Sequence, residues 1–351
     1  MKMIPILSLS LLLQVFFACH TPHKGSIMTV NGKISPEEME LTLHHEHVLV
    51  DFIGADSVEP PRYNRQTALE VILPYIKQVR DNGVQTFVEC TPRYLGRDVP
   101  LLRQLADSTG LHFITNTGYY GAMDNKFIPA EVKMMTAEEM ARLWIDEAEN
   151  GIEGTNSYPG FIKIAVERKP LSDFHRTLAR AAALTHKATG LTIMSHTGPS
   201  TGALQQLEIL KKEGVAPNAF IWTHAHNEKD SMKHVQAALM GTWVAFDAFR
   251  GGEKQTTEFV HFILNMKQHN CLHRLLLSHD AGWFDPTQPD GRNYAPHTAL
   301  FAQLIPALKE AGITPDELNL ILVKNPAEAL TIRKRFIKNE QSVKCDIFLS
   351  P

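Results

Sequence analysis

The sequence predicts a (β/α)₈ barrel, and three observations carry that prediction. Short apolar runs alternate with amphipathic stretches along most of the chain. The runs have the near-continuous apolar character of parallel strands covered on both faces. No Gly-rich GxGxxG follows the first run, as an open doubly wound sheet would favour. Eight runs occur, at 41–52, 84–91, 111–120, 160–167, 191–198, 219–226, 242–249 and 273–282.

The segments between the runs place apolar residues at helical spacing. Several end in glycine, as in ALEVILPYIKQVRDNG and HRTLARAAALTHKATG, and glycine is the preferred residue after a helix. The Pro- and Gly-rich stretch 284–296 predicts a long loop on the catalytic face of the barrel. Residues 297–312 and 315–334 predict helices that close the domain.

The N-terminus has the pattern of an export signal. Lys2 precedes an apolar run from Ile4 to Ala18, and Cys19 follows, where a bacterial lipoprotein would be cleaved and lipidated. The alternative is ordinary secretion. We therefore expect a periplasmic or cell-envelope protein that touches the membrane only through this anchor. The predicted division is a signal peptide at 1–19, a tether at 20–30, the barrel domain at 31–335 and a C-terminal tail at 336–351.

Composition excludes some partners and some metal sites. The chain of 351 residues has a formal net charge of −3 and no basic run, so we expect no nucleic-acid partner. After Cys19 the cysteines are Cys90, Cys271 and Cys345. Their spacing makes no disulfide framework and no CxxC, which predicts free thiols and no cysteine-based zinc site.

The first apolar run carries a pair of histidines, His45 and His47. Barrel active sites lie at the carboxyl ends of the strands, and positions i and i+2 of a strand face the same side. Both imidazoles therefore project together into the barrel mouth, where they suit one metal ion. Histidine is frequent, with 17 copies in the chain, so an incidental HxH is the alternative.

Lys163 interrupts the apolar run GFIKIAV. A lysine is almost never fully buried without a partner, so it either reaches the rim, pairs with a carboxylate or has a functional amine. Burial favours the neutral amine, which can add carbon dioxide and become a carbamate that bridges two cations.

Three further run ends carry ligand types: His196, His224 and Asp280. Each histidine alone would read as a rim residue, but two at equivalent ends of adjacent strands favour metal ligation. Asp280 is either a helix N-cap or a ligand that also accepts a proton from the attacking water.

These residues, in this order, resemble the amidohydrolase superfamily, and Lys163 narrows the resemblance to its binuclear branch. The surrounding sequence segments resemble those of the phosphotriesterase-like family from about Asn31 to Thr331. The segments that carry the resemblance are LTLHHEH, LGRDVPLL, NTGYY, GFIKIAV, SHTG and VKNPAEAL, in the family's order.

The resemblance implies a ligand set and a reaction. His45, His47 and Asp280 would bind the more buried of two divalent cations, most often zinc. His196 and His224 would bind the more exposed one. A carbamylated Lys163 and a hydroxide would bridge the pair, the hydroxide would attack, and Asp280 would take its proton. Relatives are often dimers, so a homodimer is also expected.

The substrate side departs from the family pattern. Ala225, His226 and Asn227 follow His224 where phosphotriesterases and lactonases carry an Asp-containing segment. Family members often place Arg directly after the strand-seven Asp, whereas here Ala248 follows Asp247 and the nearest arginine is Arg250. The candidates for contact with the substrate are Tyr120, His226, Arg250 and Trp283. For Tyr120 and Trp283 the alternative is packing in the core or in a loop.

The sequence thus predicts a binuclear hydrolase of a small-molecule lactone, carboxyl ester or phosphoester. Two alternatives stay open. One is a mononuclear, deaminase-like amidohydrolase, which would not need Lys163. The other is a lipid-anchored metal- or ligand-binding protein without catalysis, which would not need Asp280.

Overall fold

The computed structural model describes residues 25–288, 291 and 293–337. The predicted signal peptide, its Cys19 and most of the predicted tail lie outside the described residues, so the export prediction stays a prediction. Within the described ranges, no helix combines the length and apolarity needed to cross a membrane.

The predicted strands all form, and they pair in parallel. One sheet has the order β11-β10-β9-β8-β7-β6 and the other β12-β3-β4-β5. The third predicted strand is split at Thr115 into β5 and β6, so the two sheets meet there. The bounds are β3 (Thr42–Leu49), β4 (Thr86–Glu89), β5 (His112–Ile114), β6 (Asn116–Thr117), β7 (Phe161–Ala165), β8 (Thr192–His196), β9 (Phe220–Thr223), β10 (Trp243–Phe246), β11 (Leu275–Leu277) and β12 (Gly282–Phe284).

Contacts between β3 and the residues in and just after β11 bring the ends of the two sheets together. The Nδ1 of His44 in β3 lies 3.0 Å from the carbonyl oxygen of Leu277 in β11. The backbone N–H of His45 donates to the Ser278 hydroxyl at 3.1 Å. This parallel α/β arrangement is consistent with the predicted (β/α)₈ barrel.

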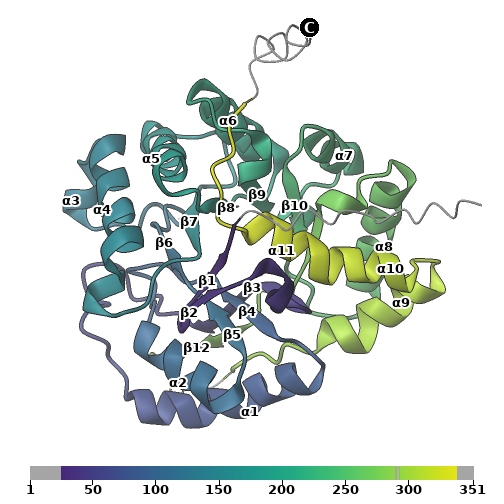
Figure 1. Cartoon of the computed structure of the whole chain (residues 1–351), viewed down its shortest axis with the longest axis horizontal. Coiled ribbons are helices and arrows are strands. Elements are labelled where there is room, and N and C mark those ends of the chain that lie inside the picture. Colours follow the sequence, from purple (N-terminus) through teal and green to yellow (C-terminus); the bar gives the residue numbers. More distant parts are fainter. Residues whose placement is uncertain (1–24, 289–290, 292, 338–351) are drawn as a thin grey trace, which may run out of the picture.

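Helices surround the strands (Figure 1). The α-helices are α1 (Arg65–Asp81), α2 (Val99–Thr109), α3 (Ala130–Lys133), α4 (Ala137–Asn150), α5 (Asp173–Thr189), α6 (Ser200–Lys212), α7 (Ser231–Leu239), α8 (Glu253–Gln268), α9 (Ile305–Glu310), α10 (Pro315–Asn319) and α11 (Asn325–Leu330). Short 3₁₀ turns are η1 (Pro36–Met39), η2 (Ile152–Gly154), η3 (Pro217–Ala219), η4 (Ala225–Asn227) and η5 (Leu272–Arg274), and π-helical turns are η7 (Leu300–Leu304) and η8 (Leu320–Lys324).

Local signals explain where many of these helices begin and end. The Ser172 side chain accepts from the His175 N–H at the start of α5, and the left-handed Gly190 ends that helix. The two predicted closing helices are each interrupted by a π-helical turn, η7 before α9 and η8 between α10 and α11.

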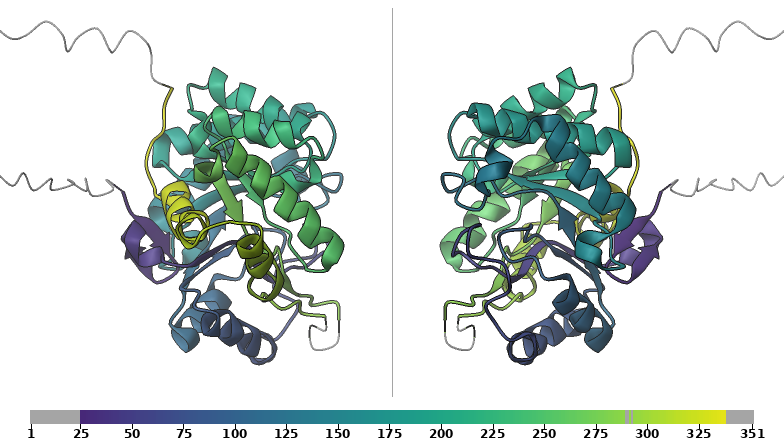
Figure 2. Two further views of the ribbon diagram at one scale, coloured as in Figure 1. Left: turned by 90° about the vertical axis from the view of Figure 1, so that its right-hand side faces the viewer. Right: turned by 90° about the vertical axis from the view of Figure 1, so that its left-hand side faces the viewer.

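The N-terminal boundary differs from the sequence prediction. Residues 25–30 were assigned to the tether, yet β1 (Ile27–Thr29) and β2 (Gly32–Ile34) form an antiparallel hairpin. Ile27 and Val30 are buried, and Ser26 forms a β-bridge with Ile332. The hairpin lies beside α11 (Figure 2). Apolar side chains at 27 and 30 therefore make this segment part of the folded domain rather than a tether.

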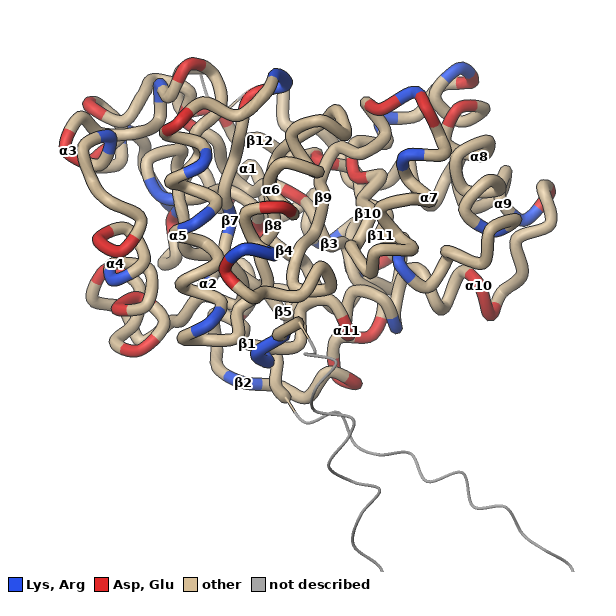
Figure 3. Tube along the Cα trace, turned by 90° about the horizontal axis from the view of Figure 1, so that it is seen from above, with Lys and Arg blue, Asp and Glu red and all other residues tan. Residues whose placement is uncertain are grey.

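The hairpin and α11 lie at the end of the molecule opposite β12 (Figure 3). Ile27 and Leu330 join the apolar cluster inside the ring of strands, together with Phe161 and Trp243. The amino ends of the strands are thus covered by packed apolar groups. The carboxyl ends are left for polar side chains.

β12 was not expected, because residues 273–282 were read as one strand followed by a loop. The strand β11 stops at Leu277, and Gly282 then pairs with His47. Gly282 has a φ of +97°, and a Cβ there would lie 1.8 Å from the His47 carbonyl oxygen. Only glycine fits this close approach, which lets the chain turn back onto β3. Cys90 and Cys271 are free, as predicted, and both are buried.

Candidate metal centre

All six predicted ligands line one cavity of about 310 Å³ at the carboxyl ends of the strands. His45 and His47 come from β3, and Lys163 comes from the middle of β7. His196 ends β8, while His224 and Asp280 follow β9 and β11. The remaining wall is formed mostly by apolar side chains, namely Val50, Phe52, Leu95, Tyr120, Met123 and Trp283.

Four of the six groups converge closely around Asp280 and Lys163. Asp280 Oδ1 lies 3.1 Å from His47 Nε2 and 3.6 Å from His45 Nε2. The Nζ of Lys163 lies 3.2 Å from the same His45 nitrogen. The Lys163 residue is only 1% exposed, so its amine is inside the site and does not reach the rim.

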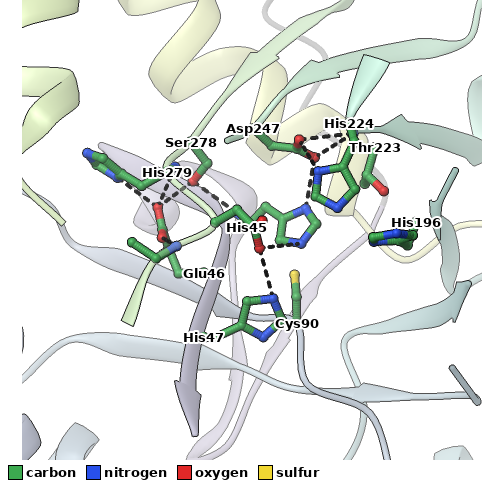
Figure 4. Close-up of polar contacts among 12 residues, drawn as sticks. His45, Glu46, His47, Cys90, His196, Thr223, His224, Asp247, Ser278 and His279 are labelled. Atoms are coloured by element: carbon green, nitrogen blue, oxygen red, sulfur yellow. Dashed lines mark hydrogen bonds and ion pairs between the residues drawn. The ribbon is translucent and has the colours of Figure 1, made fainter. Parts of the chain in front are cut away.

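The other two histidines lie side by side across the cavity from His47 (Figure 4). The ring centroids of His196 and His224 are 4.4 Å apart. The ligand atoms of His45, His224 and Asp280 all lie within 4.8 Å of one another, which is close enough to share an ion. The Tyr120 hydroxyl lies 3.2 Å from His196 Nδ1.

Buried protein groups hold the ligand rings by their Nδ1 atoms. Asp247 accepts hydrogen bonds from His45 Nδ1 and His224 Nδ1, each at 2.8 Å, and from the His224 backbone N–H. His47 Nδ1 donates to the Thr91 hydroxyl at 2.8 Å, because that hydroxyl donates to the Leu49 carbonyl. A ring that donates through Nδ1 presents the lone pair of Nε2, the form that binds a metal.

Asp247 and Thr91 were not predicted to have this role. The sequence signal for Asp247 was available, since it is a carboxylate directly after the apolar strand run of β10, a position like that of Asp280. Thr91 gave no signal that separates it from other threonines, because its partner His47 lies 44 residues away in the sequence.

The charges of the site favour neutral imidazoles beside ionised carboxylates. Burial is the main cause that lowers the pKa of His45 to about 3. Burial raises the pKa of Asp247, but His224 and His45 outweigh burial and hold it well below the usual range. His224 is the exception among the rings, since Asp247 overcomes burial and raises its pKa. Neutral imidazole and carboxylate are the protonation states that bind metals.

Two of the predicted ligands have left-handed backbones. His224 has a φ of 57° and Asp280 a φ of 54°, in the left-handed region that non-glycine residues rarely adopt. Such strain costs on the order of 1–3 kcal/mol and persists where surrounding contacts impose it. The turns after β9 and β11 are thus held in shapes that point these two side chains at the cavity.

The four predicted substrate residues differ in position. Tyr120 and Trp283 line the cavity. Arg250 stacks on the Trp283 ring at 5.1 Å, and its guanidinium lies 3.7 Å from Asp280 Oδ2, so it stands beside the site. His226 packs against the Phe259 ring and lies behind His224, so it does not line the cavity.

The chain is similar to known proteins over most of its length. A model of the phosphotriesterase family matches residues 25–330. A phosphotriesterase homology protein of Escherichia coli is 28% identical over 290 residues, which cover 82% of this chain and 96% of that protein.

Two further relatives have names that state an activity. An aryldialkylphosphatase of Saccharolobus solfataricus is 27% identical over 314 residues, covering 84% of this chain and 96% of its own. A human N-acetyltaurine hydrolase is 24% identical over 359 residues, covering 88% and 99%. The resemblance drawn from the sequence motifs is confirmed, and these hydrolase relatives support an enzyme.

Proposed function

Because the chain belongs to the phosphotriesterase family, we propose that it is a hydrolase with two divalent cations, most readily zinc, at the strand ends. The observation that carries this proposal is the convergence of six nitrogen and oxygen donors on one cavity. Four imidazoles, one carboxylate and one buried amine are a donor set suited to zinc.

The donors also fit in detail. His45, His47 and His224 each engage Nδ1 with a protein partner, which leaves Nε2 for an ion. His45, His47 and Asp280 would hold one cation, and His196 and His224 the other. Lys163 lies beside His45, and as a carbamate it would join the two. A lysine at 1% exposure is otherwise costly to bury, which supports this role.

The bound cations would activate a water molecule and polarise the oxygen of the scissile group. Asp280 is placed to accept the proton of that water, since burial raises its pKa but the three neighbouring histidines hold it below the usual value. The carboxylate is therefore ionised and ready to act as a base. The Arg250 guanidinium lies 3.7 Å from Oδ2 of Asp280, on the side of the carboxylate away from His47.

The cavity walls bear on the choice of substrate. Burial raises the pKa of Tyr120, so the phenol stays protonated and can donate a hydrogen bond to a substrate oxygen beside His196. Phe52, Met123 and Trp283 offer apolar and aromatic surface to the leaving group or acyl chain. These features support an ester-type substrate with an apolar group, that is, a lactone, a carboxyl ester or a phosphoester.

The test is metal-dependent hydrolysis by the purified, zinc-loaded full chain. Proton release is followed with lactones, aryl carboxyl esters, a phosphotriester and an N-acyl amide, each with a chelator-treated control. We expect two zinc ions per chain and one ester class hydrolysed, with activity abolished by chelation. A preference for the amide would reassign the bond class.

Lys163→Ala is the matched variant for the bridging role. Loss of the bridge should weaken binding of the second zinc by about 10–100-fold, as removal of a metal-organising group does, and should abolish most hydrolysis. A variant with two tightly bound zinc ions and full activity would defeat the binuclear proposal. One zinc per wild-type chain would favour the mononuclear alternative.

A further inference from the structure

A second polar cluster lies directly behind the metal centre, on the opposite face of β3. Side chains alternate along a strand, so His45 and His47 face the cavity while Glu46 between them faces away. Glu46 is fully buried, and it contacts His279 and His297. The predicted ligand set does not use any of these three residues.

Glu46 accepts five hydrogen bonds. Oε1 receives the Ser278 hydroxyl at 2.7 Å, the His279 backbone N–H at 2.9 Å and His279 Nδ1 at 2.8 Å. Oε2 receives the Ala281 backbone N–H and His297 Nδ1, each at 2.9 Å. Figure 4 shows the carboxylate between Ser278 and His279. Each of these donors comes from the chain that follows β11.

The three residues could hold an ion by distance alone, but their hydrogen bonds leave no lone pair for one. Both Nδ1 atoms donate to the carboxylate. The Nε2 of His279 accepts the Leu300 backbone N–H at 3.0 Å, and the Nε2 of His297 lies 3.2 Å from the Tyr294 hydroxyl. The polar atoms of the cluster are all hydrogen-bonded, so its role is to hold the segments of chain that supply those bonds.

The network holds the turn that carries Asp280. The two peptide N–H groups bound by Glu46 belong to His279 and Ala281, which flank Asp280 on either side. The backbone N–H of Asp280 itself donates to the His45 carbonyl at 3.0 Å. Asp280 has a left-handed backbone with a φ of 54°, a conformation that aspartate adopts more readily than most side chains but that is still uncommon, and the hydrogen bonds on either side of it help to hold it.

We propose that Glu46 is a positioning residue, which clamps the turn 278–281 to β3 and thereby aims Asp280 at His45 and His47. The strand presents two ligands on its inner face and, from its outer face, fixes the third. His297 extends the clamp to the segment after β12, which pairs with β3 and carries Trp283 at the cavity wall. This inference rests on the proposed metal centre.

Glu46→Gln is the sharpest variant, because it keeps the size of the side chain. In glutamine an NH₂ group replaces one of the two carboxylate oxygens, and that group cannot accept a hydrogen bond. The backbone N–H of either His279 or Ala281 therefore loses its acceptor. We expect zinc affinity, measured by competition with a chromophoric chelator on the full chain, to fall by about 10–100-fold.

A double-mutant cycle separates positioning from general damage. If Glu46 acts through Asp280, Glu46→Gln should weaken zinc binding by less than about threefold once Asp280 is alanine, since coupled residues are not additive. An equal effect in both backgrounds, or an unchanged affinity in folded Glu46→Gln, overturns the proposal. A wild-type chain that binds no zinc would instead overturn the metal centre itself.

A milder pair keeps the test usable if Glu46→Gln does not fold. His297→Leu removes one donor to Glu46, whereas His297→Asn retains an amide N–H near the position of Nδ1. We expect the leucine variant to bind zinc more weakly and the asparagine variant to recover most of the affinity.

The matched control is His186→Asn. This histidine is also buried with both nitrogens bonded, to the Leu191 carbonyl and the Arg335 N–H, but it is remote from the cavity. It should lower thermal stability without changing zinc affinity. If His186→Asn weakens zinc binding as much as Glu46→Gln does, Glu46 affects zinc binding only through the general stability of the fold, and the proposal is wrong.

Discussion

Two sets of buried histidines differ in one respect, and that respect separates the predicted metal ligands from histidines that are bonded only within the protein. His45, His47 and His224 line the cavity, whereas His186, His279 and His297 lie in the packed interior. In both sets Nδ1 is bonded to a carboxylate, hydroxyl or carbonyl oxygen of the protein, as the hydrogen bonds to Asp247, Thr91, Glu46 and Leu191 show.

The difference lies at Nε2. In His186 and His279 this nitrogen accepts a backbone N–H, and in His297 it meets the Tyr294 hydroxyl. In His45 and His47 it faces Lys163 or Asp280 instead. Burial and a bonded Nδ1 are therefore common to both sets. The predicted ligands differ in that their Nε2 atoms lie beside other donor groups of the cavity.

Among substitutions of residues that line the cavity, Asp280→Asn should reduce hydrolysis the most. Asparagine keeps the size and can still ligate weakly through oxygen, but it cannot take up the proton of the attacking water. We expect kcat to fall by about 10²–10⁴-fold, the usual contribution of a general base, at saturating zinc with metal content checked. Asp285→Asn, in the neighbouring loop, should leave kcat unchanged. An Asp280→Asn enzyme within threefold of wild type would remove Asp280 from the proton transfer.

Asp247→Asn tests the bonded Nδ1 that both sets share. Asparagine can accept from only one of His45 and His224, and its amide N–H₂ would drive the other ring to the wrong tautomer. Zinc affinity should fall by about 10–100-fold. The control is Asp98→Asn, since Asp98 is also buried but caps α2 and pairs with Arg65. A comparable loss of zinc in both variants would mean that Asp247 acts only on stability.

The sequence was sufficient for features that depend on local periodicity. The alternation of β3 separated His45 and His47 from His44, which turns to the Leu277 carbonyl on the other face. Lys163 was identifiable because an amine interrupts an apolar strand. The order of strands followed from the regular alternation with helices.

The features that the sequence did not predict depend on contacts across the closing sheet. Glu46 bonds to His279 and His297, which are 233 and 251 residues away along the chain. Asp247 joins His45, 202 residues away, to His224. Nothing in the spacing of Glu46, His279 and His297 marks them as partners, because their proximity exists only once β3 lies beside β11. Asp247 could have been noticed by its place after β10, but its two histidine partners could not be read from the sequence. The hairpin β1–β2 was missed for another reason, since its two strands are only three residues each.

The smallest expected effect concerns His186, one of the histidines in the packed interior, and the way in which the stability of the fold depends on pH. Burial lowers the pKa of His186, so the folded chain keeps this ring neutral where the unfolded chain takes up a proton. As pH falls below about 6.5, this residue should cost the wild type up to about 1.4 kcal/mol of unfolding free energy per pH unit. His186→Asn loses hydrogen bonds and is less stable at pH 7, but it lacks this proton uptake. Its stability deficit, measured by urea unfolding of the metal-free protein, should therefore shrink from pH 7 to pH 5. A deficit that stays constant over that range would mean that the folded protein accepts the proton on His186, and that a bonded Nε2 does not keep a structural histidine neutral.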